Sequence, residues 1–148
     1  LQAARSSLEQ PRKEIDSARS RAAECDYMSR ILVAEDEPHI LLLIQRKLES
    51  AGYEVIPSTN GEDAMKLALS DKPDLLLLDI MLPGCEGLEI CRVVKATYGH
   101  QAPPVILLSA LGQQIDVEAG MAAGADDYII KPFSPRQLLE RVQSALYG

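Results

Sequence analysis

The stretch Leu75–Pro83, which reads LLLLDIMLP, decides the fold. Four consecutive leucines with no polar residue between them are typical of a strand that is buried on both faces of a parallel sheet. They run directly into the carboxylate of Asp79. Two roles are open for this acid: it forms the turn after the strand, or it is a carboxylate held rigidly at the edge of a core.

Short apolar runs alternate with amphipathic segments on both sides of this stretch. Each predicted helix follows a predicted strand, which gives five strand–helix units. Such alternation is typical of an α/β domain in which a parallel sheet carries helices on both faces, and right-handed crossovers favour a doubly wound arrangement. The strands are predicted at 30–35, 53–57, 73–79, 104–110 and 125–131, and the helices at 38–52, 60–72, 88–99, 113–124 and 134–146.

The composition indicates one folded domain without a membrane span. The chain has 148 residues, 47% of them hydrophobic and 25% charged, which is enough for one hydrophobic core. No apolar run approaches the ~18 residues that a membrane helix needs, and residues 1–30 lack the apolar segment of a secretory signal. Cys25, Cys85 and Cys91 lack metal-ligand spacing. We therefore expect reduced thiols and a cytoplasmic protein.

The net charge of −7 lies after the first 28 residues, because the five basic and five acidic residues of positions 1–28 cancel. Nucleic-acid binding depends on clustered lysine and arginine that contact phosphates. We therefore expect that this acidic domain makes no direct contact with nucleic acid.

Residues 1–28 are predicted to form an extension of a domain that occupies 29–148. The few large apolar residues of the extension repeat at a seven-residue spacing from Leu1 to Ala22, but Pro11 interrupts the pattern. The repeat is too short and too weakly apolar for a sustained coiled coil. Two interpretations stay open: a disordered or weakly helical linker, and a short signalling helix that enters from an upstream module.

Polar residues stand at the ends of four predicted strands, where doubly wound sheets gather their functional groups. They are Glu35, Asp36 and Glu37 after the first strand, Asp79 after the third, Ser109 after the fourth and Lys131 after the fifth. Carboxylates brought this close together repel one another unless a cation holds them. Hard oxygen ligands with room for water suit Mg²⁺, so the sequence predicts a magnesium site.

A cation, the ammonium of Lys131 and the hydroxyl of Ser109 around Asp79 would form a site for a phosphoryl group. The positive charges would spread the charge of the phosphoryl oxygens, and the Asp79 carboxylate could attack phosphorus to give an aspartyl phosphate. Simpler roles compete with these assignments. Ser109 could be a turn hydroxyl, and Glu37 a solvated acid that favours the helix dipole.

Four segments resemble the receiver domain of two-component response regulators. The acidic pair, the aspartate, the serine and the Lys-Pro pair stand in the order of that family, and the resemblance covers about 29–148. It implies a (βα)5 domain whose five-stranded parallel sheet has the flavodoxin-like strand order 2-1-3-4-5. The segments are ILVAEDEPHI (31–40), LLLLDIMLPGCEGLE (75–89), VILLSA (105–110) and GADDYIIKPF (124–133).

The resemblance implies a role for each matching acid. Asp79 resembles the phosphoacceptor, Asp36 the direct ligand of Mg²⁺ (or Mn²⁺), and Glu35 the acidic partner that works through water. The backbone carbonyl of Met81 is implied as a further metal ligand.

The remaining matches concern the phosphoryl group and the conformational switch. Lys131 and Ser109 resemble the groups that contact the phosphoryl oxygens. Ser109 and Tyr128 resemble the pair that moves on phosphorylation, although a strand tyrosine such as Tyr128 could also be static core. The resemblance further implies a cis peptide bond between Lys131 and Pro132, an isomer that X-Pro bonds tolerate.

The implied function is a phosphorylation-activated signalling switch of a bacterial phosphorelay. It is not an enzyme for an external substrate, because it catalyses only its own phosphorylation and dephosphorylation. A sensor histidine kinase or a histidine phosphotransfer protein would supply the phosphoryl group from a phosphohistidine. Phosphorylation would then change the face formed by 113–124, 125–131 and 134–146, control an output domain or partner, and favour a homodimer through that face. The candidates for ion pairs across this dimer are Asp126, Asp127 and Arg141.

Two apolar residues flank the predicted phosphoryl site: Met81, two residues after Asp79, and Leu111, two residues after Ser109. Neither side chain can orient an attacking water, so we expect slow self-dephosphorylation and removal of the group by a partner phosphatase.

Two other protein classes fit the sequence less well. An aspartyl-phosphate phosphatase of haloacid-dehalogenase type also uses Mg²⁺ and a strand-end aspartate, but it carries a second acid at the position of Met81. A flavodoxin-like cofactor binder would need a phosphate loop after the first strand, where this chain has three acids that would repel phosphate.

Overall fold

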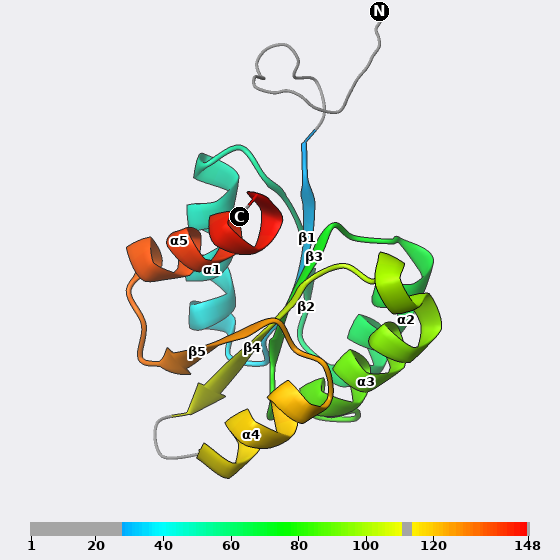
Figure 1. Ribbon diagram of the computed structural model, residues 1–148. Coiled ribbons are helices and arrows are strands. Elements are labelled where there is room, and N and C mark those ends of the chain that lie inside the picture. Colours follow the sequence, from blue (N-terminus) through cyan, green and yellow to red (C-terminus); the bar gives the residue numbers. More distant parts are fainter. Residues whose placement is uncertain (1–27, 111–113, 148) are drawn as a thin grey trace, which may run out of the picture.

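The computed structural model describes residues 28–110 and 114–147, which form five strand–helix units (Figure 1). The element bounds differ from the predicted ones by at most two residues. The strands are β1 (Arg30–Ala34), β2 (Glu54–Ser58), β3 (Leu75–Asp79), β4 (Val105–Ala110) and β5 (Asp127–Lys131). The helices are α1 (Pro38–Ser50), α2 (Gly61–Ser70), α3 (Gly87–Tyr98), α4 (Gln114–Ala122) and α5 (Pro135–Tyr147), with a 3-10 helix η2 (Gly99–Gln101) after α3. All but one residue of the predicted extension 1–28 lies outside the described residues.

The five strands form one parallel sheet in the order β2-β1-β3-β4-β5, which confirms the predicted topology. Helices α1 and α5 cover one face, and α2, α3 and α4 cover the other (Figure 1). In the described residues, no helix is long and apolar enough to cross a membrane.

The central strand β3 explains why the chain contains an unbroken run of leucines. Leu76 and Leu78 pack into the core beneath α2 and α3, whereas Leu75 and Leu77 pack into the core beneath α1 and α5. All four are fully buried. Burial of each leucine stabilises the fold by roughly 2 kcal/mol. Packing on both faces of the sheet therefore holds β3 in place and fixes the position of Asp79 at its end.

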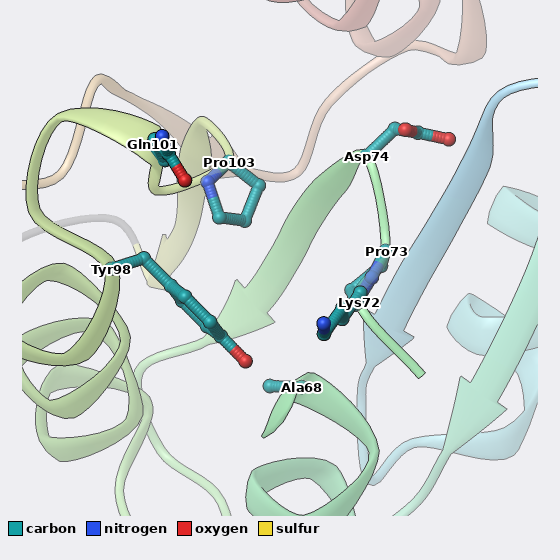
Figure 2. A pocket seen from close by; sticks show the side chains of 7 residues that line it. All are labelled: Ala68, Lys72, Pro73, Asp74, Tyr98, Gln101 and Pro103. Atoms are coloured by element: carbon teal, nitrogen blue, oxygen red, sulfur yellow. The ribbon is translucent and has the colours of Figure 1, made fainter. Parts of the chain in front are cut away.

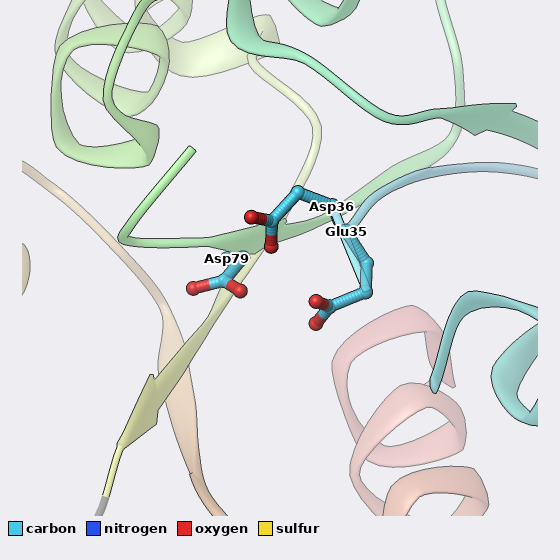
Figure 3. A group of neighbouring side chains, drawn as sticks. All are labelled: Glu35, Asp36 and Asp79. Atoms are coloured by element: carbon cyan, nitrogen blue, oxygen red, sulfur yellow. The ribbon is translucent and has the colours of Figure 1, made fainter. Parts of the chain in front are cut away.

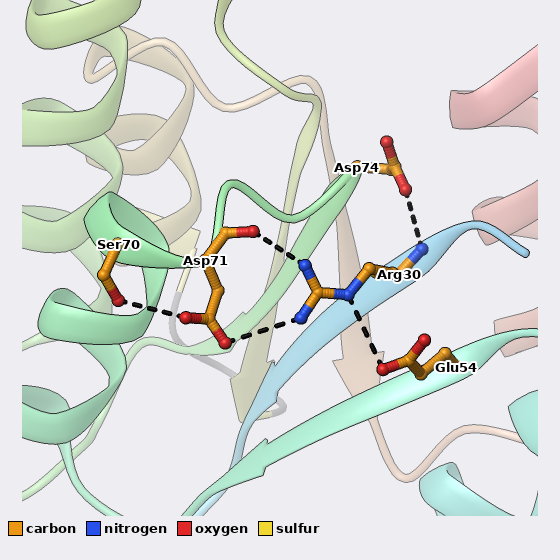
Figure 4. A network of polar contacts seen from close by, with 5 residues as sticks. All are labelled: Arg30, Glu54, Ser70, Asp71 and Asp74. Atoms are coloured by element: carbon orange, nitrogen blue, oxygen red, sulfur yellow. Dashed lines mark hydrogen bonds and ion pairs between the residues drawn. The ribbon is translucent and has the colours of Figure 1, made fainter.

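A polar network fixes the start of β1 at the edge of the sheet opposite Asp79 (Figure 4). The Arg30 guanidinium donates to the carbonyl of Asp71 (2.8 Å) and lies 3.6 Å from the carboxylate of Glu54. The Arg30 backbone N–H donates to Asp74 Oδ2 at 2.7 Å, and Ser70 Oγ donates to the Asp71 carboxylate at 3.2 Å. One side chain therefore joins β1, β2 and the segment that leads into β3.

Candidate functional site

The polar residues predicted at the strand ends meet at the carboxyl edge of the sheet. Glu35 and Asp36 directly follow β1, and Asp79 is the last residue of the neighbouring strand β3. Figure 3 shows the three carboxylates grouped around a common space. One oxygen from each of them lies within 4.8 Å of the others. The sheet therefore brings together acids that are more than forty positions apart in the chain.

Asp79 is held on both sides. Its Oδ1 accepts a hydrogen bond from the Met81 backbone N–H at 3.0 Å, and its Oδ2 accepts one from Lys131 Nζ at 2.7 Å. The side chain is only 8% exposed. Because β3 is rigid and both oxygens are bonded, the carboxylate has a fixed orientation at the rim of the core.

Lys131, the last residue of β5, connects two of the acids. Its Nζ lies 2.7 Å from Asp79 Oδ2 and 2.8 Å from Glu35 Oε1. Burial by itself would lower the pKa of Lys131, but the hydrogen bond to Asp79 and the contacts with Glu35 outweigh burial and raise it. The ammonium therefore stays protonated at neutral pH.

Glu35 is completely buried, whereas its neighbour Asp36 is exposed. Burial raises the pKa of Glu35 above its ordinary value of 4.5, and Lys131 and the Glu37 N–H offset part of this effect. That N–H donates to Glu35 Oε2 at 3.0 Å. Oε1 has the ammonium as its ion-pair partner but accepts no well-directed hydrogen bond. This buried oxygen can therefore still accept a water or face a second cation.

The donor set at this edge is consistent with a metal site. Three carboxylates and one ammonium leave two negative charges, which a divalent cation would balance. All the donors are hard oxygens, and Asp36 is open to solvent, so bound waters could complete an octahedral shell. These residues fit Mg²⁺ better than a soft or tetrahedral metal, which would select sulfur or imidazole ligands.

The structure places the predicted switch residues on β4 and β5. Ser109 is 1% exposed, and its Oγ donates to the Ala110 carbonyl at 3.3 Å. Tyr128 is half-buried and packs against the core beneath α2 and α3. The Lys131–Pro132 peptide bond is cis. Slow self-dephosphorylation was predicted from two apolar residues, Met81 and Leu111. Of these, Leu111 lies outside the described residues.

The residues predicted to form ion pairs across a dimer have partners within the chain. Arg141 on α5 donates to both carboxylate oxygens of Asp127, at 2.7 and 2.8 Å. Asp126 accepts from Lys95 on α3 at 2.7 Å and from the Val105 N–H at 2.8 Å. Neighbouring residues of an extended segment point to opposite sides, so adjacent acids find partners on different helices.

Glu37 has a more specific place than a solvated acid of the first helical turn. It is the N-cap of α1, and its carboxylate accepts a hydrogen bond from the His39 N–H at 3.1 Å. The signal for this role was present in the sequence, because Pro38 favours the first helical position and thereby marks the preceding residue as the cap.

Sequence reasoning missed two glycines that border the site. A Cβ on Gly87 would lie 3.0 Å from the carbonyl carbon of Asp79, and one on Gly61 would lie still closer, 2.5 Å, to the carbonyl carbon of Cys85 in the segment that follows Asp79. The only sequence signals were Asn60-Gly61 and Pro83-Gly84, which mark turns but do not tell which segments those turns approach.

A pocket of about 440 Å³ lies at the edge of the sheet opposite Asp79 (Figure 2). Asp74 lines this pocket and also belongs to the network of Arg30. Tyr98 forms part of its wall and donates from its hydroxyl to the Leu69 carbonyl at 3.1 Å. The pocket contains none of the strand-end residues and is separate from the acidic site. Its lining residues are Ala68, Lys72, Pro73, Asp74, Tyr98, Gln101 and Pro103.

Two solved structures are similar to this chain in fold and sequence, and one curated protein is similar to it in sequence. A putative response regulator from Chloroflexus aurantiacus J-10-fl is 32% identical with a TM-score of 0.76, over 82% of this chain and 100% of that one. The BeF3-activated DrrB receiver domain is 39% identical with a TM-score of 0.73, again over 82% of this chain and 100% of that one. The alkaline phosphatase synthesis transcriptional regulatory protein PhoP of Bacillus subtilis (strain 168) is 43% identical over 117 residues.

The match to PhoP covers 79% of this chain and 48% of PhoP, so the chain spans about half the length of this curated relative. Residues 31–143 match the family model described as the response regulator receiver domain. This match includes all five strands of the sheet except the first residue of β1. The chain therefore belongs to the response regulator receiver domains of two-component signalling, a family that is phosphorylated on aspartate.

Proposed function

We propose that the domain is a switch in which Asp79 accepts a phosphoryl group from the phosphohistidine of a sensor histidine kinase or a histidine phosphotransfer protein. The observation that carries the proposal is the setting of Asp79. It is nearly buried at the end of a rigid strand, its two oxygens are oriented by Met81 and Lys131, and two further acids lie beside it. Family membership implies the kinase partner.

In the transfer step, a carboxylate oxygen of Asp79 attacks phosphorus while the phosphorus–nitrogen bond of the phosphohistidine breaks. The imidazole nitrogen keeps the electron pair of that bond, and the product is an aspartyl phosphate. Lys131 Nζ, now 2.7 Å from Asp79, is placed to move its contact from the carboxylate to a phosphoryl oxygen. The ammonium thereby stabilises the charge that gathers on the phosphoryl group.

Glu35, Asp36, Asp79 and the Met81 carbonyl would hold Mg²⁺ or Mn²⁺, with Glu35 acting through water. The cation supplies positive charge opposite the phosphoryl oxygens when it is bound. The exposed Asp36 is suited to direct ligation, because it can exchange solvent for metal with little other rearrangement. The buried Glu35 is already engaged by Lys131, which suits an indirect role.

Ser109 and Tyr128 would transmit the phosphorylated state. At 3.3 Å, the bond from Ser109 Oγ to the Ala110 carbonyl is long for a hydroxyl donor, so a phosphoryl oxygen would be a stronger acceptor. Movement of Ser109 would let Tyr128 turn inward and change the face formed by α4, β5 and α5. This is a shift between two packings of one fold.

The α4–β5–α5 face would then control an output domain or partner and form a homodimer. Met121 on α4 and Ile130 on β5 are 44% and 38% exposed, which leaves apolar surface for such a contact. PhoP is described as a transcriptional regulatory protein. We infer by analogy that the output of this switch acts on transcription through a separate nucleic-acid-binding part, because the domain at 29–148 carries the whole net charge of −7.

The test is incubation of the protein with acetyl phosphate and Mg²⁺, followed by intact-protein mass spectrometry. The wild type should gain one phosphoryl group, and Asp79→Ala should gain none. Asp63→Ala removes an exposed aspartate of α2 and serves as the matched control, which should react like the wild type. Phosphorylation of Asp79→Ala to the wild-type level would show that another residue is the acceptor.

A further inference from the structure

The segment between Asp79 and α3 is held by three backbone N–H groups. Met81 N–H donates to Asp79 Oδ1 at 3.0 Å, and Gly87 N–H donates to the Ile80 carbonyl at 3.1 Å. The third donor comes from a distant part of the chain: Gly61 N–H, at the start of α2, donates to the Pro83 carbonyl at 2.8 Å. The first turn of α2 is thus tied directly to residues 80–86, which we call the Asp79 loop.

Gly61 also approaches this loop more closely than any other residue type could. A Cβ added to Gly61 would lie 2.5 Å from the carbonyl carbon of Cys85 and 2.6 Å from its backbone nitrogen, and it would overlap the Cys85 carbonyl oxygen. Real Cβ atoms essentially never come within 3.0 Å of a neighbour. The neighbour here is backbone, so a change of side-chain rotamer cannot relieve the overlap.

The loop, and not α2, would yield to such an overlap. The start of α2 is anchored because Asn60 Oδ1 accepts from the Asp63 N–H at 2.8 Å and Ser58 Oγ donates to the Asn60 carbonyl at 2.9 Å. Ala64, one turn further, is fully buried. On the other side, Ile80 and Leu82 are buried, but Pro83, Gly84 and Glu86, which lie beside Cys85, are exposed and have less packing to lose.

We infer that Gly61 is a positioning residue for the Asp79 site. Gly61 determines the position of the Asp79 loop. The loop in turn determines the positions of two Met81 groups: the N–H that orients Asp79 and the carbonyl that would bind the cation. This inference rests on the proposed function. Pro83 is only two residues from Met81, so a displaced Pro83 carbonyl pulls on the segment that holds Oδ1 of Asp79.

The test compares Gly61→Ala with Gly99→Ala. Gly99 has a φ of 58° and nothing within 4 Å of its hypothetical Cβ, so alanine there strains the backbone without touching the loop. Mg²⁺ would be titrated into each protein while the Met81 amide is followed by NMR, and thermal unfolding would report stability. The half-saturating Mg²⁺ concentration should rise about 10-fold in Gly61→Ala and change less than about twofold in Gly99→Ala.

The inference is overturned if Gly61→Ala folds and shows the half-saturation and Met81 amide shift of the wild type. If Gly61→Ala does not fold, Asn60→Ala decides, because it removes the cap that anchors the first turn of α2 and loosens Gly61 without an overlap. Weaker Mg²⁺ binding in Asn60→Ala would support the inference, and unchanged binding would overturn it. A wild type that neither binds Mg²⁺ nor gains a phosphoryl group would instead overturn the proposed function and this inference with it.

Discussion

Replacing Lys131 by methionine should destabilise the protein mainly through Glu35. The ammonium lies 2.8 Å from the carboxylate of Glu35, which is 0% exposed, and 2.7 Å from that of Asp79, which is 8% exposed. At these distances each gross attraction is about 6 kcal/mol with an effective dielectric constant near 20. Most of this is offset by the cost of desolvating the charges. Because Glu35 would stay buried without its partner, we expect a net loss of about 3 kcal/mol in the free energy of unfolding.

Lys95→Met is a matched control, because the Lys95 side chain is also 21% exposed and its Nζ also lies 2.7 Å from an aspartate. That partner, Asp126, is 46% exposed and regains water when the lysine is removed. A loss of about 1 kcal/mol or less is expected for Lys95→Met.

The pH dependence of the stability loss in Lys131→Met is a second test of the role of Glu35. Burial raises the pKa of Glu35 in the folded protein, and loss of Lys131 removes a group that lowers it, so the pKa should rise further in Lys131→Met. Between the ordinary value of 4.5 and the raised pKa, unfolding releases a proton, and raising the pH therefore favours unfolding. The stability lost in Lys131→Met should be smallest below pH 4.5 and grow as the pH rises above it.

The assay is urea unfolding without divalent cations across this pH range, repeated at neutral pH with millimolar Mg²⁺. Mg²⁺ should restore part of the stability of Lys131→Met, because it supplies positive charge to the same acids, and it should not restore Lys95→Met. The reasoning is refuted if Lys131→Met is no less stable than Lys95→Met at neutral pH, or if its deficit does not shrink in acid.

Three further predictions concern the core, the phosphoryl lifetime and the assembly. Leu77→Ala should lower the free energy of unfolding by about 2–5 kcal/mol, because Leu77 is fully buried in the central strand; urea unfolding would measure it, and a loss below about 1 kcal/mol would contradict this packing. The aspartyl phosphate should persist well beyond seconds in Mg²⁺, and Met81→Asn should shorten its half-life about 10-fold by offering a group that orients water. Mass spectrometry would measure the decay, and a wild-type half-life of only seconds would contradict the prediction. Beryllofluoride with Mg²⁺ should shift the protein to a dimer in gel filtration, and Ile130→Glu should abolish the shift; an unchanged elution of the wild type would argue against a dimer through the α4–β5–α5 face.

The sequence by itself determined the class of fold because the deciding signals are local, whereas the strand order followed from the resemblance to a known family. The unbroken leucines of β3 indicate a strand buried on both sides, and the spacing of apolar residues in a helical segment such as α2 marks the face that the helix buries. Five alternating units then restrict the sheet to very few arrangements. The order of the units also indicated that Glu35, Asp36, Asp79, Ser109 and Lys131 stand at one edge.

Only the tertiary structure decided how these residues share that edge. Glu35 and Asp36 are adjacent in the chain, yet one is completely buried against Lys131 and the other is open to solvent. The acids expected to pair across a dimer are bound to Lys95 and Arg141 of the same chain. Burial and pairing depend on contacts between residues far apart in the sequence, which no local pattern encodes.

The close approach of Gly61 to the Asp79 loop has the same origin. An Asn-Gly pair predicts a turn. Glycine is required at position 61, however, because the backbone of Cys85, more than twenty residues away, leaves no room for a Cβ. The sequence determined that a carboxylate stands at the end of the central strand. Which groups orient that carboxylate, and which backbone atoms hold those groups in place, followed only when the strands and helices were packed against one another.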